Sequence, residues 1–268
     1  METKPLISLS TAVVCYNSPS LELKKLLTSL LDSIEQLKQS FELSSIPIYL
    51  IDNSDESSLE VDILSVVDEG RCKFLNIEPR LVQGQGNVGY GSAHNLVISN
   101  LSSHFHLLLN PDVVLQKSTL TIGINFLLEN SEVIVASPHA VDAKGDKQYL
   151  CKRYPSVFTF LIRGVFPNYL KNIFKSRLSS YEMHNLSENE PAVDVPIVSG
   201  CFMLLRSSSL KEIEGFDERY FLYFEDFDLS LRLGKKGKLA YLPAMPVSYT
   251  HLRAHETLRY LVCRLLLE

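Results

Sequence analysis

The sequence predicts an α/β fold with a mostly parallel central sheet and helices on both faces. Short apolar runs alternate with stretches of helical periodicity, and the early runs each end in polar residues. The composition agrees, since 46% of the 268 residues are hydrophobic, enough for the core of one large domain. In open α/β sheets ligands bind beyond the carboxyl ends of the strands, so these polar ends are the first place to look for function.

The chain begins with a β-α-β pattern. Residues 11–17 and 47–51 form two apolar runs, and between them leucine and isoleucine recur at helical spacing over 18–39. Asn17 and Asp52 should therefore lie side by side at one edge of the sheet. The alternative for Asp52 is a turn residue that caps the next helix.

A third strand is expected at 73–77, followed by a glycine-rich loop at 84–91 and a helix at 92–101. The loop has the spacing Gly-x-Gly-x-x-Gly, but the dinucleotide fingerprint directly follows a strand, and here 78–83 intervenes. We interpret the loop more generally as backbone whose amides can approach an anionic group. A plain glycine turn is the alternative.

Asp112 is the clearest single candidate for a ligand-binding residue. The apolar run 105–109 predicts a buried strand that Pro111 ends, before a helix at 119–130 and a strand at 133–137. A carboxylate just past a core strand suits Mg²⁺ or Mn²⁺, which keep several waters and take other ligands from substrate phosphates. The alternative is that Asp112 only caps the following turn or helix.

Residues 151–181 differ from the rest of an acidic chain, because they contain basic and aromatic residues and no acidic one. We interpret 151–190 as a basic insertion. Peripheral contact with an anionic membrane or a lipid diphosphate through 151–177 is one interpretation, and a solvated helical excursion with a core-facing aromatic stripe is the other. Its basic residues are Lys152, Arg153, Arg163, Lys171, Lys175 and Arg177, and its aromatic residues include Phe158, Phe160, Phe166, Tyr169 and Phe174.

After a strand expected at 193–206, five carboxylates lie among bulky aromatic residues. Carboxylates held against apolar groups and one another have raised proton affinity, which a general base needs. If a helix begins near Glu225, then Asp228 and Arg232 pair at i,i+4 and Glu225 or Asp226 faces the cleft. Complementing the helix dipole is the alternative role for these acids.

The overall composition excludes some classes of protein. A net charge of −5 argues against a general nucleic-acid binder. Five scattered cysteines without Cys-x-x-Cys fit a reducing cytosol and no structural zinc. No signal peptide and no apolar run of about 18 residues is visible, so a cytoplasmic protein is expected, with its subunit number open.

Four motifs, taken in this order and spacing, resemble the inverting glycosyltransferases of family 2, which have the GT-A fold. The rhamnosyltransferase-like members that assemble cell-envelope polysaccharides such as O-antigen are the most similar in character. The resemblance covers about 11–246. It rests on Val14–Asn17, on Ile51–Ser54, on Asn87–Asn95 with Asn110–Asp112, and on Gly215–Asp217 with Phe224–Asp228.

The resemblance implies roles for individual residues. Asp112 would hold the Mg²⁺ or Mn²⁺, Asn110 replaces the first acid of the family's Asp-x-Asp, and Asp226 would be the catalytic base with Glu225 as its neighbour. The base and ribose would contact the first two strand ends, and Gly89 and Asn95 would line the diphosphate side. The full nucleotide-binding set would be Tyr16, Asn17, Asp52, Asn53, Gly89, Asn95 and Asn110.

The activity implied is sugar transfer by a GT-A domain at 1–247. We expect L-rhamnose from dTDP-rhamnose as donor and a polyprenyl-diphosphate-linked or growing glycan as acceptor. A position at the inner face of the plasma membrane follows if 151–177 contacts lipid. The alternative is a non-catalytic sugar-nucleotide-binding or scaffold protein.

The segment 248–268 departs from the family and resembles translated sequencing-adapter read-through, so we expect a non-native tail there. The family histidine of this region cannot be assigned to His251. A native terminal helix is the alternative, because Leu258, Leu261, Val262, Leu265 and Leu266 have helical spacing.

Overall fold

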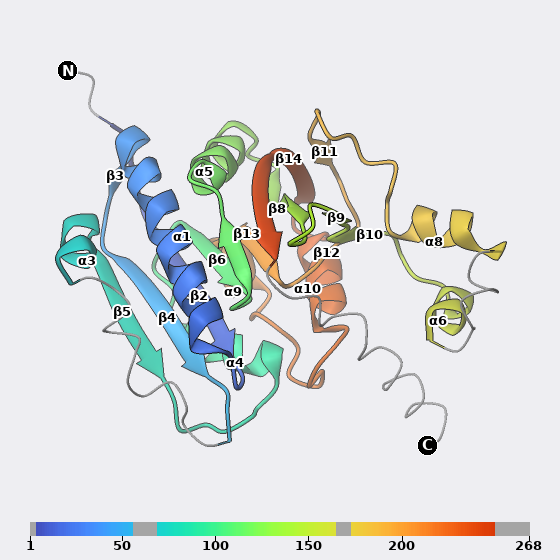
Figure 1. The fold of residues 1–268 in the computed structure, drawn as a ribbon, viewed down its shortest axis with the longest axis horizontal. Helices are drawn as coiled ribbons and strands as arrows, with labels where there is room; N and C mark the ends of the chain where they lie inside the picture. The colour runs from blue at the N-terminus through green and yellow to red at the C-terminus, as the bar shows by residue number, and fades with distance from the viewer. Residues whose placement is uncertain (1–3, 56–68, 165–172, 250–268) are drawn as a thin grey trace.

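The computed structural model describes residues 4–55, 69–164 and 173–249. Its centre is a ten-stranded sheet (Figure 1), in which β7 (Val113–Leu115) pairs with β14 and β9 (Lys147–Gln148) pairs with β8. The remaining strands follow one another in the order β11 (Ala192–Val193), β14 (Lys238–Tyr249), β8 (Val133–Val141), β13 (Phe202–Arg206), β6 (Phe105–Leu109), β2 (Leu9–Cys15), β4 (Ile46–Asp52) and β5 (Ile77–Val82).

Strand direction confirms the mostly parallel sheet. β6, β2, β4 and β5 pair in parallel, and β14 is parallel to β8. From β14 to β5, β13 is the one described strand that runs against the others, because it lies antiparallel to both β8 and β6. The carboxyl ends of β2, β4, β5 and β6 therefore meet at one edge.

Helices cover both faces of this sheet (Figure 1). α1 (Ser20–Ser40), α3 (Glu69–Leu75) and α5 (Thr119–Glu129) contribute to one core cluster, and α4 (Tyr90–Ile98), α9 (Ser207–Glu212) and α10 (Glu225–Leu233) contribute to the other. Alternate residues of β2 divide between the two clusters, Val13 facing one and Val14 the other, as the two-residue period of a strand requires. The leucines and isoleucines that predicted α1 are buried along one stripe.

The prediction of a strand at 73–77 is wrong. The chain is helical in α3 up to Leu75, turns at Asn76 with a φ of 59°, and then forms β5. The apolar residues there follow helical spacing, since Cys72 and Leu75 are buried while Phe74 is 61% exposed. Pro79 is compatible with β5 because β5 ends the sheet. The glycine loop therefore does follow a strand closely, contrary to the expectation.

In place of the single strand predicted at 193–206, the structure has three short strands. β11 and β13 flank β12 (Ile197–Val198), which pairs with β10 (Cys151–Lys152) away from the main sheet. A separate small pair joins β1 (Leu6–Ile7) to β3 (Glu42–Leu43). The sequence did not predict β14, whose two prolines fall near a register irregularity between Leu242 and Pro246.

The basic insertion carries α6 (Val157–Gly164) and α8 (Lys175–Tyr181), at the end of the molecule farthest from β5 (Figure 1). Phe158 and Phe174 join the two helices by an edge-to-face contact with ring centroids 5.2 Å apart. Residues 165–172, with Phe166, Tyr169 and Lys171, lie outside the described residues.

None of the described helices is both long enough and apolar enough to cross a bilayer. Of the expected tail, 250–268 lies outside the described residues, His251 included, while Ser248 and Tyr249 complete β14 by pairing with Val114 and Val113.

Candidate active site

The ends of β2 and β4 lie side by side, as the sequence predicted. The Asn53 amide donates to the Cys15 carbonyl at 2.8 Å, and the Asn17 amide donates to the Ser54 hydroxyl at 3.0 Å. Tyr16 and Asn17 are exposed beyond β2. This edge therefore presents an aromatic ring and an amide side chain.

Asp52 is buried at the end of β4, where it is 1% exposed. Its Oδ1 accepts a hydrogen bond from the Ser54 amide at 3.1 Å, and its carbonyl accepts one from Gln85 at 2.6 Å. These contacts stabilise the turn after β4, and residues 56–68, which follow it, lie outside the described residues. Its role with a nucleotide stays a prediction.

Asn53, at the end of β4, is hydrogen-bonded to the glycine loop. The Asn53 side chain accepts from the Val88 amide at 3.2 Å and donates to Asn87 at 3.1 Å. At the end of the loop, Gly89 has a φ of 90°, and a Cβ there would lie 2.4 Å from the Phe221 carbonyl oxygen. Gly89 is thus needed for a close approach of two backbone segments.

Gly200 connects two helix starts. Its carbonyl accepts a hydrogen bond from the Tyr90 hydroxyl at 2.7 Å, and its amide donates to Oδ2 of Asp226 at 3.0 Å. Tyr90 is the first residue of α4 and Asp226 the second of α10. The next carbonyl, of Cys201, accepts the Asn110 amide at 2.9 Å. Gly200 and Cys201 therefore link both helices to the turn that follows β6.

Three carboxylates lie close enough to the Tyr90 hydroxyl to act on it electrostatically. Burial, followed by the neighbouring Cys201, Glu225, Asp226 and Asp112, raises the pKa of Tyr90 above its usual range. Such effects fall off with distance, so the turn carrying Asp112 and the start of α10 converge. The structure thus brings together the predicted metal ligand and the predicted base.

Glu225 is buried against apolar groups. It is 7% exposed, and among the described residues its Oε2 has no hydrogen-bond partner. Burial, and then the charge of Asp226, raises the pKa of Glu225 to about 7. Tyr223 and Phe224, just before α10, both have a φ of 68°. Backbone of this kind costs about 1–3 kcal/mol per residue and is often found at functional sites.

Backbone amides donate hydrogen bonds to the Asp226 carboxyl group. Burial raises the pKa of Asp226, while hydrogen bonds from the amides of Gly200, Phe227 and Asp226 itself, together with the Lys152 ammonium, oppose the rise. A carboxylate with raised proton affinity suits a general base.

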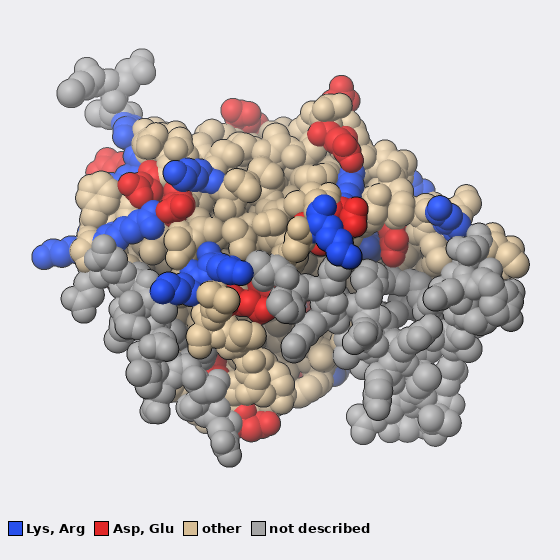
Figure 2. All heavy atoms as spheres, viewed as in Figure 1, with Lys and Arg blue, Asp and Glu red and all other residues tan. Residues whose placement is uncertain are grey.

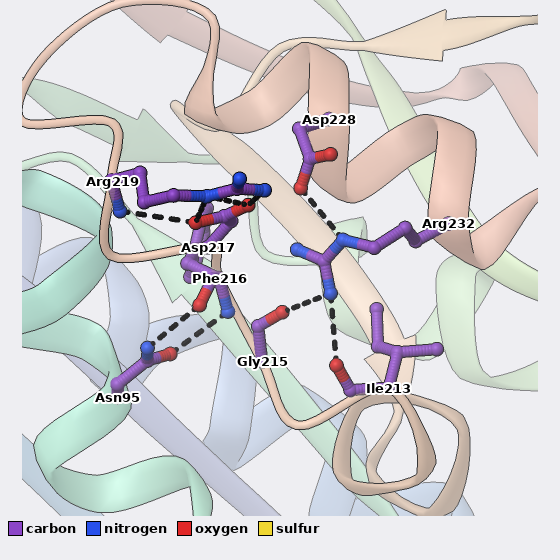
Figure 3. Close-up of polar contacts among 8 residues, drawn as sticks. All are labelled: Asn95, Ile213, Gly215, Phe216, Asp217, Arg219, Asp228 and Arg232. Carbon is purple, nitrogen blue, oxygen red and sulfur yellow. Dashed lines mark hydrogen bonds and ion pairs between the residues drawn. The ribbon is translucent and has the colours of Figure 1, made fainter.

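Asn95 and Arg232 form hydrogen bonds to the segment between α9 and α10 from two sides (Figure 3). The Asn95 side chain exchanges two hydrogen bonds, both 2.8 Å, with the backbone of Phe216. Arg232 pairs with Asp228 at 2.6 Å, as predicted, and donates to the carbonyls of Ile213 and Gly215. The contacts of Asn95 in the structure are therefore internal, and its place beside a diphosphate stays a prediction.

The donor set around Asp112 fits a metal that is shared with substrate. Within the described residues, no three His, Cys, Asp or Glu side chains are grouped as a metal site. A single carboxylate is enough for Mg²⁺ or Mn²⁺ when waters and substrate phosphates complete the shell. Asp112 is the residue that would hold the ion.

Sequence reasoning missed Tyr90, Gly200 and Cys201, and did not place Lys152 near the base. A signal existed for two of them. The small and polar residues Ser199–Cys201 interrupt an otherwise apolar stretch, which argues against one continuous strand and for a turn.

A family model described as "Glycosyltransferase like family 2" matches residues 7–259. An N-acetylglucosaminyl-diphospho-decaprenol L-rhamnosyltransferase of Mycobacterium tuberculosis (strain CDC 1551 / Oshkosh) is 30% identical over 192 residues, which are 66% of this chain and 60% of that protein. The rhamnosyltransferase WbbL of Escherichia coli (strain K12) is 27% identical over 178 residues, 62% of each chain. The chain thus spans about three-fifths of the length of these relatives.

Solved structures with the same fold share little sequence with the chain. GalNAc-T7 with UDP, GalNAc and Mn²⁺ has a TM-score of 0.63 at 13% identity, over 93% of this chain and 44% of that one. The mannosyltransferase PcManGT from Pyrobaculum calidifontis with GDP-Man and Mn²⁺ has 0.59 at 14%, over 92% and 58%. TarS of S. aureus with UDP has 0.57 at 16%, over 91% and 61%. These similarities show the fold.

Proposed function

Because the chain belongs to the glycosyltransferase-like family 2, we propose that it is an inverting hexosyltransferase that uses a nucleotide-sugar donor. The observation that supports the proposal is that the turn carrying Asp112 and the start of α10 are joined through Gly200 and Cys201: the Asn110 amide donates to the Cys201 carbonyl and the Gly200 amide to Asp226. A metal-binding carboxylate and a base on separate segments are what transfer from a sugar diphosphate requires.

The reaction is one displacement at the anomeric carbon of the donor. The acceptor oxygen forms a bond to that carbon, the bond to the diphosphate oxygen breaks, and Asp226 accepts the proton of the acceptor hydroxyl. Attack from the side opposite the leaving group inverts the anomeric configuration. Asp112 would hold a divalent ion, which when bound would neutralise charge on the departing diphosphate. Positioning of both substrates provides much of the remaining acceleration.

We assign the nucleotide to the edge formed by β2, β4 and the glycine loop. Tyr16 and Asn17 are exposed there, whereas Asp52 and Asn53 are buried and stabilise the edge through their turn and loop contacts. For the transferred group, L-rhamnose from dTDP-rhamnose is the proposal, since two relatives are named rhamnosyltransferases.

A lipid-linked acceptor is proposed on the same ground, because the mycobacterial relative is named for a diphospho-decaprenol substrate. Contact of 151–177 with the inner face of the plasma membrane would bring the site to such an acceptor. Tyr154, Val157 and Ile173 are exposed apolar residues of this segment. Figure 2 shows basic and no acidic side chains on the described surface of α8.

The test is sugar transfer by the wild-type protein and by Asp226→Asn and Asp112→Asn. We expect each variant to lose at least about 100-fold in rate, the lower range for a general base. A thermal-shift panel of nucleoside diphosphates, with and without Mn²⁺, identifies the base, because a bound ligand stabilises the native state. Asp226→Asn should keep the nucleotide-induced shift, whereas Asp112→Asn should lose its metal-dependent part.

Asp146→Asn is the matched control, because Asp146 is an exposed aspartate in the turn between β8 and β9. It should transfer at the wild-type rate. Near wild-type turnover by Asp226→Asn would contradict the assignment of the base. Nucleotide binding without any transfer or donor hydrolysis by the wild type would instead support the scaffold alternative.

A further inference from the structure

We propose that Tyr90 is a positioning residue for the base: its hydroxyl fixes the Gly200 peptide, and the Gly200 amide in turn orients the Asp226 carboxylate. The inference rests on the proposed function, because it takes Asp226 as the proton acceptor. Tyr90 itself need not touch either substrate in this role.

The hydrogen bonds have one direction. A backbone carbonyl only accepts, so the Tyr90 hydroxyl donates to Gly200 at 2.7 Å. The Gly200 amide then donates to Oδ2 of Asp226 at 3.0 Å. Two short bonds in series thus connect the start of α4 to the base at the start of α10.

Gly200 is enclosed between the two side chains that it connects. A Cβ at this position would lie 3.3 Å from Cβ of Asp226 and 3.4 Å from Cε1 of Tyr90. Glycine is therefore the residue that lets Tyr90 and Asp226 approach the same peptide. A side chain at Gly200 would press on both of them.

The phenol ring of Tyr90 contacts two aromatic rings, and its backbone is hydrogen-bonded as well. His94 meets it edge-on with ring centroids 4.6 Å apart, and Phe216 does so at 6.0 Å. The Tyr90 amide donates to the Phe221 carbonyl at 3.1 Å. Because ring and backbone are both held, the hydroxyl has a defined position from which to orient Gly200.

The charged and titratable groups that act on Asp226 determine its proton affinity. Burial raises the pKa of Asp226, while the Gly200 amide and Lys152 on β10 oppose the rise. Asp226 in turn raises the pKa of its sequence neighbour Glu225. Cys201, the protonated Tyr90 and Asp112 belong to the same surroundings. The Gly200 amide bond favours the ionised carboxylate, so weakening this bond raises the pKa of Asp226.

The test is Tyr90→Phe, which keeps the ring and removes the hydroxyl. We expect kcat to fall about tenfold, part of the roughly 10²–10⁴-fold that a general base contributes. The donor KM should stay unchanged. A base must be ionised to act, so a raised pKa of Asp226 should move the acidic limb of the kcat–pH profile to higher pH. Gly200→Ala should shift kcat and the limb in the same direction.

The matched control is Tyr241→Phe. Tyr241 is also a buried tyrosine, and its hydroxyl hydrogen-bonds His139 at 2.8 Å on β8, outside this chain of contacts. It should leave kcat and the acidic limb at their wild-type values. A Tyr90→Phe protein whose kcat and acidic limb of the kcat–pH profile both match the wild type would overturn the proposal. A lower kcat with an unmoved limb would also overturn it, because that result describes a merely structural role.

A second measurement separates this inference from the proposed function. Carbon-detected NMR titration of the Asp226 carboxyl needs no activity, and it should give a higher pKa in Tyr90→Phe than in the wild type or in Tyr241→Phe. An unchanged Asp226 pKa overturns the positioning role even if transfer is observed. A raised pKa in a protein that transfers no sugar upholds the contact chain and refutes only the activity.

Discussion

Two adjacent acids, Glu225 and Asp226, occupy different surroundings at the start of α10. Asp226 receives the Gly200 amide, whereas Oε2 of Glu225 is buried without a hydrogen-bond partner in the described part of the chain. Carboxyls in such different environments take different protonation states near neutral pH. The surroundings thus raise the pKa of Glu225 to about 7, whereas the proposed base Asp226 is hydrogen-bonded by a backbone amide.

The protonation of Glu225 predicts an unusual pH dependence of stability. Its pKa of about 7 lies above the ordinary 4.5, so the native state holds a proton that the unfolded state releases. Between these values the free energy of unfolding should therefore fall as pH rises, by a total on the order of 3 kcal/mol.

Glu225→Gln should remove this penalty. We expect it to be more stable than the wild type at pH of about 8 and similar to it near the unfolded-state pKa of a glutamate. Denaturant unfolding at both pH values measures the difference. Glu190→Gln, at an exposed position, is the control and should leave the wild-type pH dependence intact. Equal stabilities of Glu225→Gln and wild type at the higher pH would refute a raised pKa of the native Glu225.

At the level of elements, the site depends on how α4 and α10 are tied together. Gly89 approaches the backbone of Phe221 just before α10, and Tyr90 donates to the same carbonyl. Asn95 and Arg232 hold the preceding segment from both helices (Figure 3). These contacts place the glycine loop and the acidic helix start in fixed relation.

Two glycines of one loop offer a sharp test of this close approach. Gly84 and Gly89 have almost the same φ, 91° and 90°, but a Cβ at Gly84 has nothing within 4 Å, whereas one at Gly89 meets the Phe221 oxygen at 2.4 Å. Gly84→Ala should cost about 1–2 kcal/mol of stability, the backbone penalty alone. Gly89→Ala should cost clearly more and also lower the transfer rate. Equal losses in denaturant unfolding would show that the approach to Phe221 does not constrain the site.

At the scale of the whole molecule, the insertion with α6 and α8 is a second region for which we propose a role. The predicted donor and catalytic residues gather where β2, β4 and β6 end, and the insertion with α6 and α8 lies at the end away from β5 (Figure 1). Val157 is 78% and Ile173 70% exposed in this insertion. Arg153, Lys175 and Arg177 are exposed there as well. Apolar and basic groups together suit an anionic bilayer surface.

The membrane proposal predicts that the wild-type protein floats with phosphatidylcholine vesicles that contain phosphatidylglycerol and not with phosphatidylcholine alone. A double variant, Val157→Asp with Ile173→Asp, should lose most of this binding, and higher ionic strength should weaken it. Leu21→Asp, on α1 at a residue 64% exposed, should bind as the wild type does. Equal flotation of both variants would refute a docking role for 151–177.

The spacing of apolar and polar residues along the sequence determined most of the architecture. The stripe of α1, the apolar runs of β2, β4 and β6, and the polar residues at their ends are periodic features that a chain shows before it folds. For the same reason Asp112 could be placed beyond a strand, and the pair of Asp228 and Arg232 on one helix face.

The tertiary structure decided what periodicity leaves ambiguous. Residues 73–75 are helical because Cys72 and Leu75 are buried in the core cluster to which α1 contributes. β14 forms despite its prolines because it lies between β8 and β11. The contacts at Gly200 join it to residues 110 and 26 positions away, to Tyr90 and Asp226 respectively. Hydrogen bonds between such distant residues form only when the fold brings them together, so no local pattern encodes them.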